Sequence, residues 1–228
     1  MINTVIFDAF GTLFKVEKGA SAKKIICNII SAGTAVNYDS FLSEWVSYYK
    51  EHTAPDAPFM TERDIFISRI QMFYERYGVD RNASSDTDAM LSDAFNRRAF
   101  DEVQETIALL RKKFRVFIGS NTDNDLLEAV MAKNNIAVDM VYTSEGLKCY
   151  KPDPSFFRQI LTENDLTPDN VIFIGDSVSD DILGPKPLGI KTVLIDRENN
   201  HPDAGQDHTI SDLRELTEIL TIERPDLA

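Results

Sequence analysis

Short apolar runs of strand length recur along this chain, and stretches with helical spacing separate them. Strands that alternate with helices pair in parallel, because a helix carries the chain back to the start of the next strand. The pattern therefore predicts an α/β fold with a doubly wound parallel sheet and helices on both of its faces. The predicted strands are Thr4–Phe7, Arg115–Gly119, Met140–Tyr142, Val171–Ile174 and Thr192–Ile195.

A long segment without a predicted strand interrupts this alternation after the first strand. Its apolar residues follow helical spacing instead, in stripes at 25–30, 41–49 and 66–77. We therefore predict an inserted, all-helical subdomain. The predicted boundaries are 1–14 and 99–228 for the core and 15–98 for the insertion.

The insertion leaves and rejoins the core at the carboxyl end of the first strand, which is where open α/β sheets bind ligands. Within it, Thr61 followed by Asp64 is typical of a helix start. Two polar clusters, 82–88 and 196–207, are interpreted as loops because they are rich in turn-forming residues. No chemistry is predicted for these two clusters.

Charge and hydrophobicity limit the partners of such a chain. Its 24 Lys and Arg against 37 Asp and Glu give a net charge of −13, which repels nucleic acid and anionic membrane surfaces. The expected partner is a small anionic substrate, which then needs a locally positive site or a metal ion. No apolar run approaches a membrane span of about 20 residues, and the expected location is the cytoplasm. The composition does not predict an oligomeric state.

Two clusters follow predicted strands near the start and middle of the chain. In VIFDAFGTLF (5–14), Asp8 ends an apolar strand, and Gly11 and Thr12 follow in a turn whose amide groups could face an anion. In RVFIGSNTDND (115–125), Ser120 and Asn121 follow a strand, and the serine could donate to an anion at the next helix start. Taken alone, the first is more often a simple turn and the second a helix cap.

Two further clusters follow later elements. In LKCYKPDPSFF (147–157), Lys151 precedes a stiffening proline, with a helix predicted to begin near Pro154, and could place a positive charge between carboxylates and an anion. In VIFIGDSVSDDILG (171–184), Asp176 ends a strand, and Asp180 and Asp181 lie one turn later. Carboxylates at the end of a strand are suitable ligands for Mg²⁺. Acidic residues at a helix start also interact favourably with the helix dipole, and this explanation requires no metal. The four clusters occur in the order acid, hydroxyl, lysine and acid cluster, which chance rarely produces.

This order resembles the four motifs of the haloacid dehalogenase superfamily, carried here by FDAFGTL, GSN, YKPDPSFF and GDSVSDDILG. The resemblance covers nearly the whole core, and the helical insertion matches the family's cap in position and character. It implies a Rossmann-like core and a hydrolase that uses an aspartate nucleophile. The family's phosphatases act on small phosphorylated metabolites with Mg²⁺ as cofactor.

The resemblance also assigns roles to residues. It implies Asp8 as nucleophile, with Ser120 and Lys151 as further catalytic residues. It places the transferring group near Gly11, Thr12 and Asn121. The implied metal ligands are Asp8, the backbone carbonyl of Phe10, Asp176, and either Asp181 or Asp180.

One position departs from the phosphatase pattern. Phosphatases of the family carry a second Asp two residues after the nucleophile as general acid and base, and this chain has Phe10 there. Loss of such a general acid and base lowers the rate by on the order of 10²–10⁴-fold. The sequence does not identify a group that replaces it. Haloacid dehalogenases have an aromatic residue there, but they lack the Asp176 equivalent and place an Arg directly after a cap Trp. In this chain Val46 follows Trp45.

Three hypotheses remain from the sequence. The first is a magnesium-dependent phosphoric monoester or acyl phosphate hydrolase, and the second is a metal-independent hydrolase of 2-haloacids. The third is a non-catalytic module that binds a phosphorylated ligand or a protein. Phosphonate-cleaving relatives need a cap lysine, and none stands out. Substrate choice is expected to reside in the cap, where Lys18, Arg63 and Arg69 could contact an anion, but no cap residue is assigned.

Overall fold

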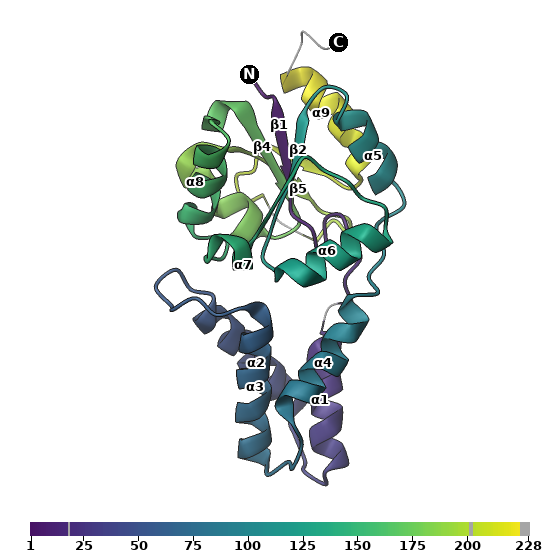
Figure 1. Cartoon of the computed structure of the whole chain (residues 1–228), viewed down its shortest axis with the longest axis vertical. Coiled ribbons are helices and arrows are strands. Elements are labelled where there is room, and N and C mark those ends of the chain that lie inside the picture. The colour runs from purple at the N-terminus through teal and green to yellow at the C-terminus, as the bar shows by residue number, and fades with distance from the viewer. Residues whose placement is uncertain (18, 201–202, 224–228) are drawn as a thin grey trace. The chain divides into compact units, whose positions relative to one another are not determined.

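The computed structural model describes residues 1–17, 19–200 and 203–223 and divides the chain into two compact units (Figure 1). One unit contains the chain up to Lys15 and from Arg98 onward, and the other is Val16–Arg97. These boundaries fall within one residue of those expected from the sequence. Lys18 lies outside the described residues.

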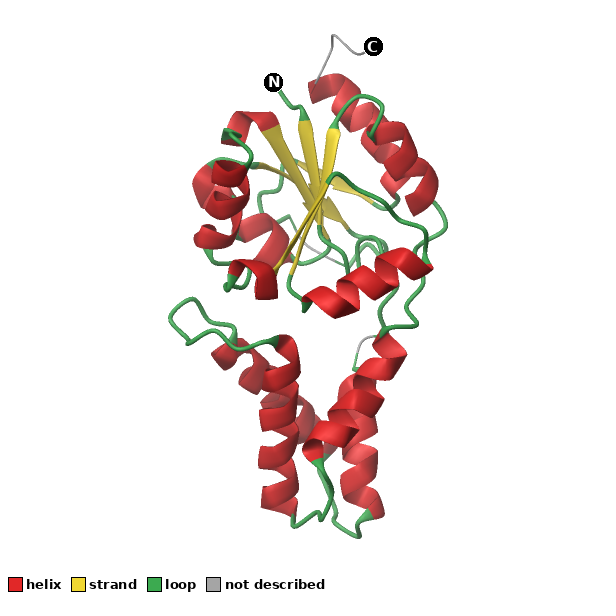
Figure 2. Cartoon of the chain, viewed as in Figure 1, coloured by secondary structure: helices red, strands yellow, loops and turns green. Residues whose placement is uncertain are grey.

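The first unit contains a parallel sheet of six strands among the described residues, in the order β3-β2-β1-β4-β5-β6. Helices cover both sides of the sheet, with α8 on one side and α5 and α9 on the other (Figures 1 and 2), which confirms the predicted α/β fold. The strands are β1 (Thr4–Phe7), β2 (Arg115–Ser120), β3 (Met140–Thr143), β4 (Val171–Gly175), β5 (Lys191–Ile195) and β6 (His208–Ile210). The other elements are α5 (Val103–Leu110), α6 (Asn124–Lys133), α7 (Ser144–Leu147), α8 (Pro154–Glu163), α9 (Leu216–Glu223), η1 (Pro168–Asn170), η2 (Val178–Leu183), η3 (Lys186–Leu188) and η4 (Leu213–Glu215).

The centre of the sheet is held by apolar side chains that the strand register aligns. Ile6 of β1 pairs with Phe117 of β2 and with Phe173 of β4, and all three are almost fully buried. Phe156 and Phe157 of α8 pack onto this row. Burying such a side chain stabilises the fold by about 1.5–3 kcal/mol, so the row fixes β1 rigidly between its neighbours.

The second unit is all helical: α1 (Ala20–Ser31), α2 (Tyr38–His52), α3 (Glu62–Tyr77) and α4 (Ala83–Ala94). The three predicted stripes lie on α1, α2 and α3 and meet in one apolar core that includes Ile25, Phe41 and Phe73. The predicted helix start is confirmed, because the Thr61 side chain accepts a hydrogen bond from the backbone N–H of Asp64 (3.1 Å). Phe73 packs on Phe41 with ring centroids 4.5 Å apart.

Of the two polar clusters interpreted as loops, 196–207 is a loop over its described residues, whereas most of 82–88 is helical. Asn82 caps α4 by accepting from Ser85, and the helix buries Ala83, Thr87 and Met90 on one face. The interpretation of 82–88 as a loop was therefore wrong, because the same Ser, Asn and Asp residues that favour turns also favour helix starts. The edge strand β6, which follows the cluster 196–207, was not predicted, because it is only three residues long and contains no apolar run.

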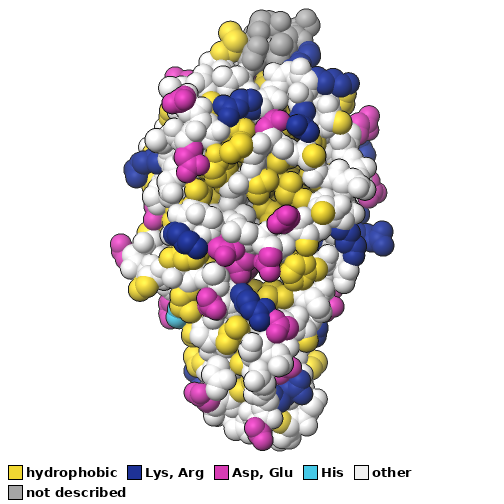
Figure 3. All heavy atoms as spheres, in the orientation of Figure 1, with side chains coloured by type: hydrophobic (Ala, Val, Ile, Leu, Met, Phe, Trp, Pro, Cys, Tyr) yellow, Lys and Arg dark blue, Asp and Glu magenta, His cyan; other side chains and the backbone are white. Residues whose placement is uncertain are grey.

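The charged side chains are spread over the surface. On the face shown in Figure 3, Asp and Glu side chains alternate with Lys and Arg, without a large area of one sign. In the described part of the chain, none of the helices combines the length and the apolar character that crossing a membrane requires.

Candidate active site

Asp8 lies directly after β1, at the carboxyl edge of the sheet. Its backbone N–H donates to the carbonyl oxygen of Ile174 in β4 (2.8 Å), so the residue is held between two central strands. Ser120, the last residue of β2, donates its hydroxyl to Oδ1 of Asp8 (3.1 Å). The Asp8 side chain is largely buried, which makes these two hydrogen bonds strong determinants of its orientation.

Lys151 reaches the same carboxylate from the loop before α8. Its buried Nζ donates to Oδ1 of Asp8 (2.9 Å), to Oδ1 of Asp181 (2.7 Å) and to the carbonyl oxygen of Gly119 (2.9 Å). All three donor positions of the ammonium group are therefore used. Burial alone lowers the pKa of Lys151, but the carboxylates of Asp181 and Asp8 outweigh it and the pKa is raised. Lys151 is a fixed positive charge.

Asn121 anchors the loop that carries Lys151. Its side-chain oxygen accepts from the backbone N–H of Lys151 (2.7 Å), and its Nδ2 donates to the Lys151 carbonyl oxygen (2.9 Å). The same Nδ2 lies 3.4 Å from Oδ2 of Asp180. The sequence suggested that Asn121 binds the transferring group, whereas in this structure both ends of its amide contact the Lys151 backbone.

Three carboxylates meet at the edge of the sheet. Ligand oxygens of Asp8, Asp176 and Asp181 lie within 4.8 Å of one another. Asp181 is buried, accepts from the backbone N–H of Ser177 (3.0 Å), and has a raised pKa because of burial, with Asp8 acting in the same direction. The side chain of Asp180, the other residue considered for this role, accepts from Ser179 (2.7 Å) and lies beside Asn121.

The donor set of this cluster suits a hard divalent cation. It offers only carboxylate oxygens, which Mg²⁺ prefers, and three carboxylates with one lysine leave an excess negative charge. Such an excess in a desolvated site is unfavourable unless a cation or bound protons balance it. The residues present therefore fit a magnesium ion.

The loop after Asp8 is shaped around Asp176. Gly11 has a φ of +102°, and a Cβ built on it would overlap the Asp176 carboxylate. The hydroxyl of Thr12 lies 3.5 Å from Oδ1 of Asp176. Phe10, where phosphatases have their second Asp, packs its ring against Phe14 with centroids 5.9 Å apart.

Replacing Gly11 by Ala is expected to damage this part of the site. Gly33, which also has a positive φ (+89°) but no atom of a described residue within 4 Å of a built Cβ, provides the matched control. Both variants incur the backbone strain, about 1–3 kcal/mol. Gly11→Ala adds the overlap with Asp176, so urea unfolding should show the larger loss of stability, by a further 1–3 kcal/mol or so. Equal losses would show that Asp176 does not constrain residue 11.

Arg197 is a contact of this loop that the sequence did not reveal. It stands in the cluster 196–207, and its Nη2 donates to the carbonyl oxygen of Thr12 (2.9 Å) and pairs with Glu102 (2.7 Å). Its guanidinium also stacks on Phe100, 3.5 Å from the ring centroid. The partners are far apart in sequence and lie in no shared motif, so only the fold brings them together.

The comparisons with known proteins agree with this geometry. The family model of haloacid dehalogenase-like hydrolases matches residues 2–189. A six-stranded parallel sheet with Asp8, Ser120, Lys151 and the acidic cluster at its carboxyl edge defines a hydrolase of this type, and the chain belongs to the haloacid dehalogenase-like hydrolases.

Two relatives that align with nearly the full length of this chain are named for different activities, one as a dehalogenase and one as a phosphatase. The chain is 25% identical to (S)-2-haloacid dehalogenase 4A of Burkholderia cepacia, over 96% of this chain and 95% of that one. It is 26% identical to glyceraldehyde 3-phosphate phosphatase of Pyrococcus furiosus, over 97% and 94% respectively. The solved L-2-haloacid dehalogenase from Xanthobacter autotrophicus shares the fold with a TM-score of 0.73 at 18% identity, covering 96% of this chain and 98% of that one.

Proposed function

We propose that this protein is a magnesium-dependent phosphohydrolase that acts on a small anionic metabolite through Asp8. The observation that carries the proposal is the cluster of Asp8, Asp176 and Asp181, in which Asp8 and Asp181 share the ammonium group of Lys151. Asp8, the Phe10 carbonyl and Asp176 would hold the ion, with Asp181 supporting it. When bound, the ion supplies charge stabilisation to the transferring phosphoryl group.

Asp8, Ser120 and Lys151 have separate roles in the proposed reaction. A carboxylate oxygen of Asp8 forms the bond to phosphorus as the bond to the leaving-group oxygen breaks. Ser120 and Lys151 orient that carboxylate, and Lys151 offsets the charge that gathers around it. Water then attacks the phosphorus of the aspartyl phosphate, which releases inorganic phosphate and restores Asp8.

Phe10 limits the substrates that suit this mechanism. Its side chain has no proton to give to a leaving group, and it packs on Phe14 instead. The mechanism therefore favours leaving groups that depart without protonation, such as those of acyl and aryl phosphates. We propose substrates of this class.

Metal removal tests the proposal directly. With Mg²⁺, p-nitrophenyl phosphate and acetyl phosphate should release phosphate, and EDTA should abolish the release. Asp176→Asn should weaken the apparent affinity for Mg²⁺ by about 10–100-fold or more. Asp180→Asn is the control, because Asp180 lies beside Asn121 and should leave that affinity nearly unchanged. Failure of both substrates with Mg²⁺ would count against a phosphohydrolase.

A metal-independent 2-haloacid hydrolase is the second candidate. Phe10 favours it, since a halide leaves without a proton, and the relative from Burkholderia cepacia bears that activity in its name. Chloride release from a 2-chloroacid in the presence of EDTA would support this candidate. Asp176 supports the phosphohydrolase instead, because a halide reaction gives its carboxylate no metal to bind.

A further inference from the structure

Arg69 of α3 is buried in the helical unit with part of its guanidinium unpartnered. Its side chain is 1% exposed, and its carbon Cζ lies 3.5 Å from the ring centroid of Trp45 and 4.8 Å from that of Phe66. Nη1 donates to the carbonyl oxygen of Trp45 (2.7 Å). Nε and Nη2 have no hydrogen-bond partner among the described residues.

The two unpartnered nitrogens are adjacent on the guanidinium. Nε and Nη2 direct parallel N–H bonds to the same side, which is the fork that binds a carboxylate or phosphate through two hydrogen bonds. Leaving such a charged donor pair buried without an acceptor is costly. Burial lowers the pKa of Arg69 to about 9, although the nearby carboxylate of Glu62 acts in the opposite direction. The guanidinium still carries its charge at neutral pH.

Arg69 is one of the residues that line a pocket of about 330 Å³ within the helical unit. Its volume is in the range of small-molecule sites. Of the described residues, three cationic and one acidic line it, so this lining is positive in a chain whose net charge is −13. Glu62 also lies near Arg69 and Arg97 and reduces this excess without cancelling it. The lining that matters here is Glu17, Lys50, Arg69, Arg97, Trp45 and Phe66.

We propose that this pocket binds a small organic anion, whose carboxylate or phosphate group accepts from Nε and Nη2 of Arg69 while a flat or apolar body lies against Trp45 and Phe66. Arg69 stacks on both rings, so the anion would meet a guanidinium that is already held in place. The inference does not depend on which bond Asp8 attacks.

Trp45 provides the readout, because it is the only tryptophan of the chain and contacts Arg69. Benzoate and phenylphosphonate are the probes, and benzyl alcohol is the neutral control. Saturable changes in tryptophan fluorescence are expected with one or both anions and not with the alcohol. A response to benzoate alone identifies a carboxylate site, and one to phenylphosphonate alone identifies a phosphate site. No saturable response to either anion would overturn the proposal.

Arg69→Met separates a binding role from a structural one. It removes the charged fork, so binding should weaken by about 10–100-fold, the loss expected for hydrogen bonds to a charged group. The melting temperature should stay the same or rise, since a buried unpaired charge is replaced by an apolar side chain. A clear fall in melting temperature, or unchanged binding, would overturn the proposal.

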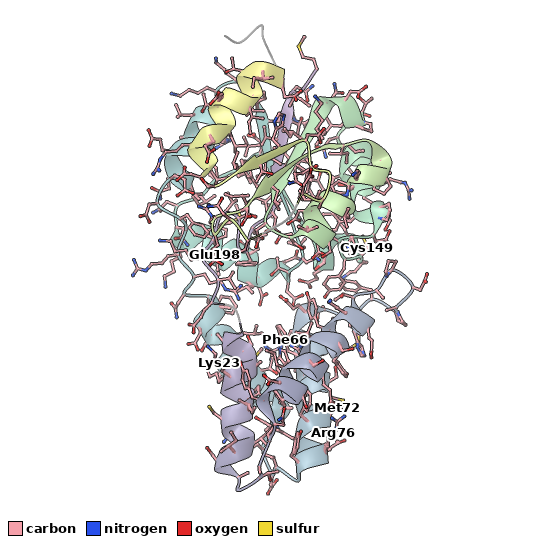
Figure 4. All side chains as sticks on the ribbon, turned by 180° about the vertical axis from the view of Figure 1, so that it is seen from behind. Lys23, Phe66, Met72, Arg76, Cys149 and Glu198 are labelled. Carbon is pink, nitrogen blue, oxygen red and sulfur yellow. The ribbon has the colours of Figure 1, made fainter. Side chains whose placement is uncertain are left out.

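Two further variants complete the test. Arg76→Met is the matched control, because Arg76 lies near the other end of α3 from Phe66, is exposed and pairs with Glu44 (Figure 4). It should leave the fluorescence titration unchanged. Arg69→Lys keeps the positive charge but loses the paired N–H donors. The variant should fold, and its affinity for the anion should be at least several-fold lower than that of the wild type. Wild-type affinity in Arg69→Lys would exclude the two-point contact.

Discussion

Replacing Asp8 by Asn is expected to abolish hydrolysis and leave the fold intact. The amide has nearly the same shape and can still accept from Ser120 and Lys151, but it cannot form the covalent intermediate. Loss of the nucleophile should lower kcat by on the order of 10⁴-fold or more. Phosphate release measures this under the proposed function, and chloride release measures it under the second candidate.

The melting temperature provides the second measurement on Asp8→Asn. The substitution removes one of three neighbouring carboxylates, and Lys151 keeps its contact with Asp181, so the fold should lose little stability. Asp101→Asn is the control, since Asp101 is exposed and its pair with Lys15 contributes little. If Asp8→Asn kept turnover within tenfold of the wild type, Asp8 would not be the nucleophile of either reaction. A wild type without turnover would favour the non-catalytic module.

The sequence predicted the central strands of the sheet well because they are buried on both faces. Ile6, Phe117 and Phe173 stand in continuous apolar runs, which are hard to place anywhere except in the centre of a parallel sheet. Parallel strands end at one edge, so the polar residues after β1, β2 and β4 had to meet there. The closeness of Asp8, Ser120 and Asp176 follows from that register.

Other contacts of the site could not be predicted because they depend on loop paths. The spacing of Asn121 and Lys151 does not show that the amide of one holds the backbone of the other. The choice between Asp180 and Asp181 depends on the winding of η2 after Ser177. The burial of Arg69 on α3 could not be predicted for another reason, since a lone arginine in an amphipathic helix is more often a solvated residue.

Lys151→Met is expected to destabilise the protein strongly as well as to inactivate it. The ammonium group is the shared partner of Asp8 and Asp181, and its removal leaves two buried carboxylates facing each other. Breaking a buried ion pair from one side costs about 3–5 kcal/mol. Urea unfolding in EDTA measures the loss without compensation by a metal ion. Lys15→Met, which breaks the exposed pair with Asp101, is the control and should cost at most about 1 kcal/mol.

The loss in Lys151→Met should depend on pH. Burial and Asp8 raise the pKa of Asp181, and the substitution removes the lysine that opposes them. Between the unfolded pKa of the carboxyl group and its raised folded pKa, the folded state binds more protons than the unfolded state, so stability falls as the pH rises. In the wild type this folded pKa is already raised to about 8, and without Lys151 it lies higher still, so the two proteins differ in bound protons above that pH. Lys151→Met should therefore be closer to the wild type at neutral pH than at alkaline pH. A loss that is the same at both values would show that Asp181 does not titrate in this way.

A double substitution separates stability from chemistry at this site. Lys151→Met with Asp181→Asn removes the charge pair together, so most of the stability lost in Lys151→Met should return. Activity should not return, because Asp8 still lacks the positive charge beside it. Together with the single variant Asp181→Asn, these proteins form a double-mutant cycle, and its interaction energy measures how strongly Lys151 and Asp181 are coupled. Recovery of activity together with stability would mean that Lys151 acts only by holding the fold.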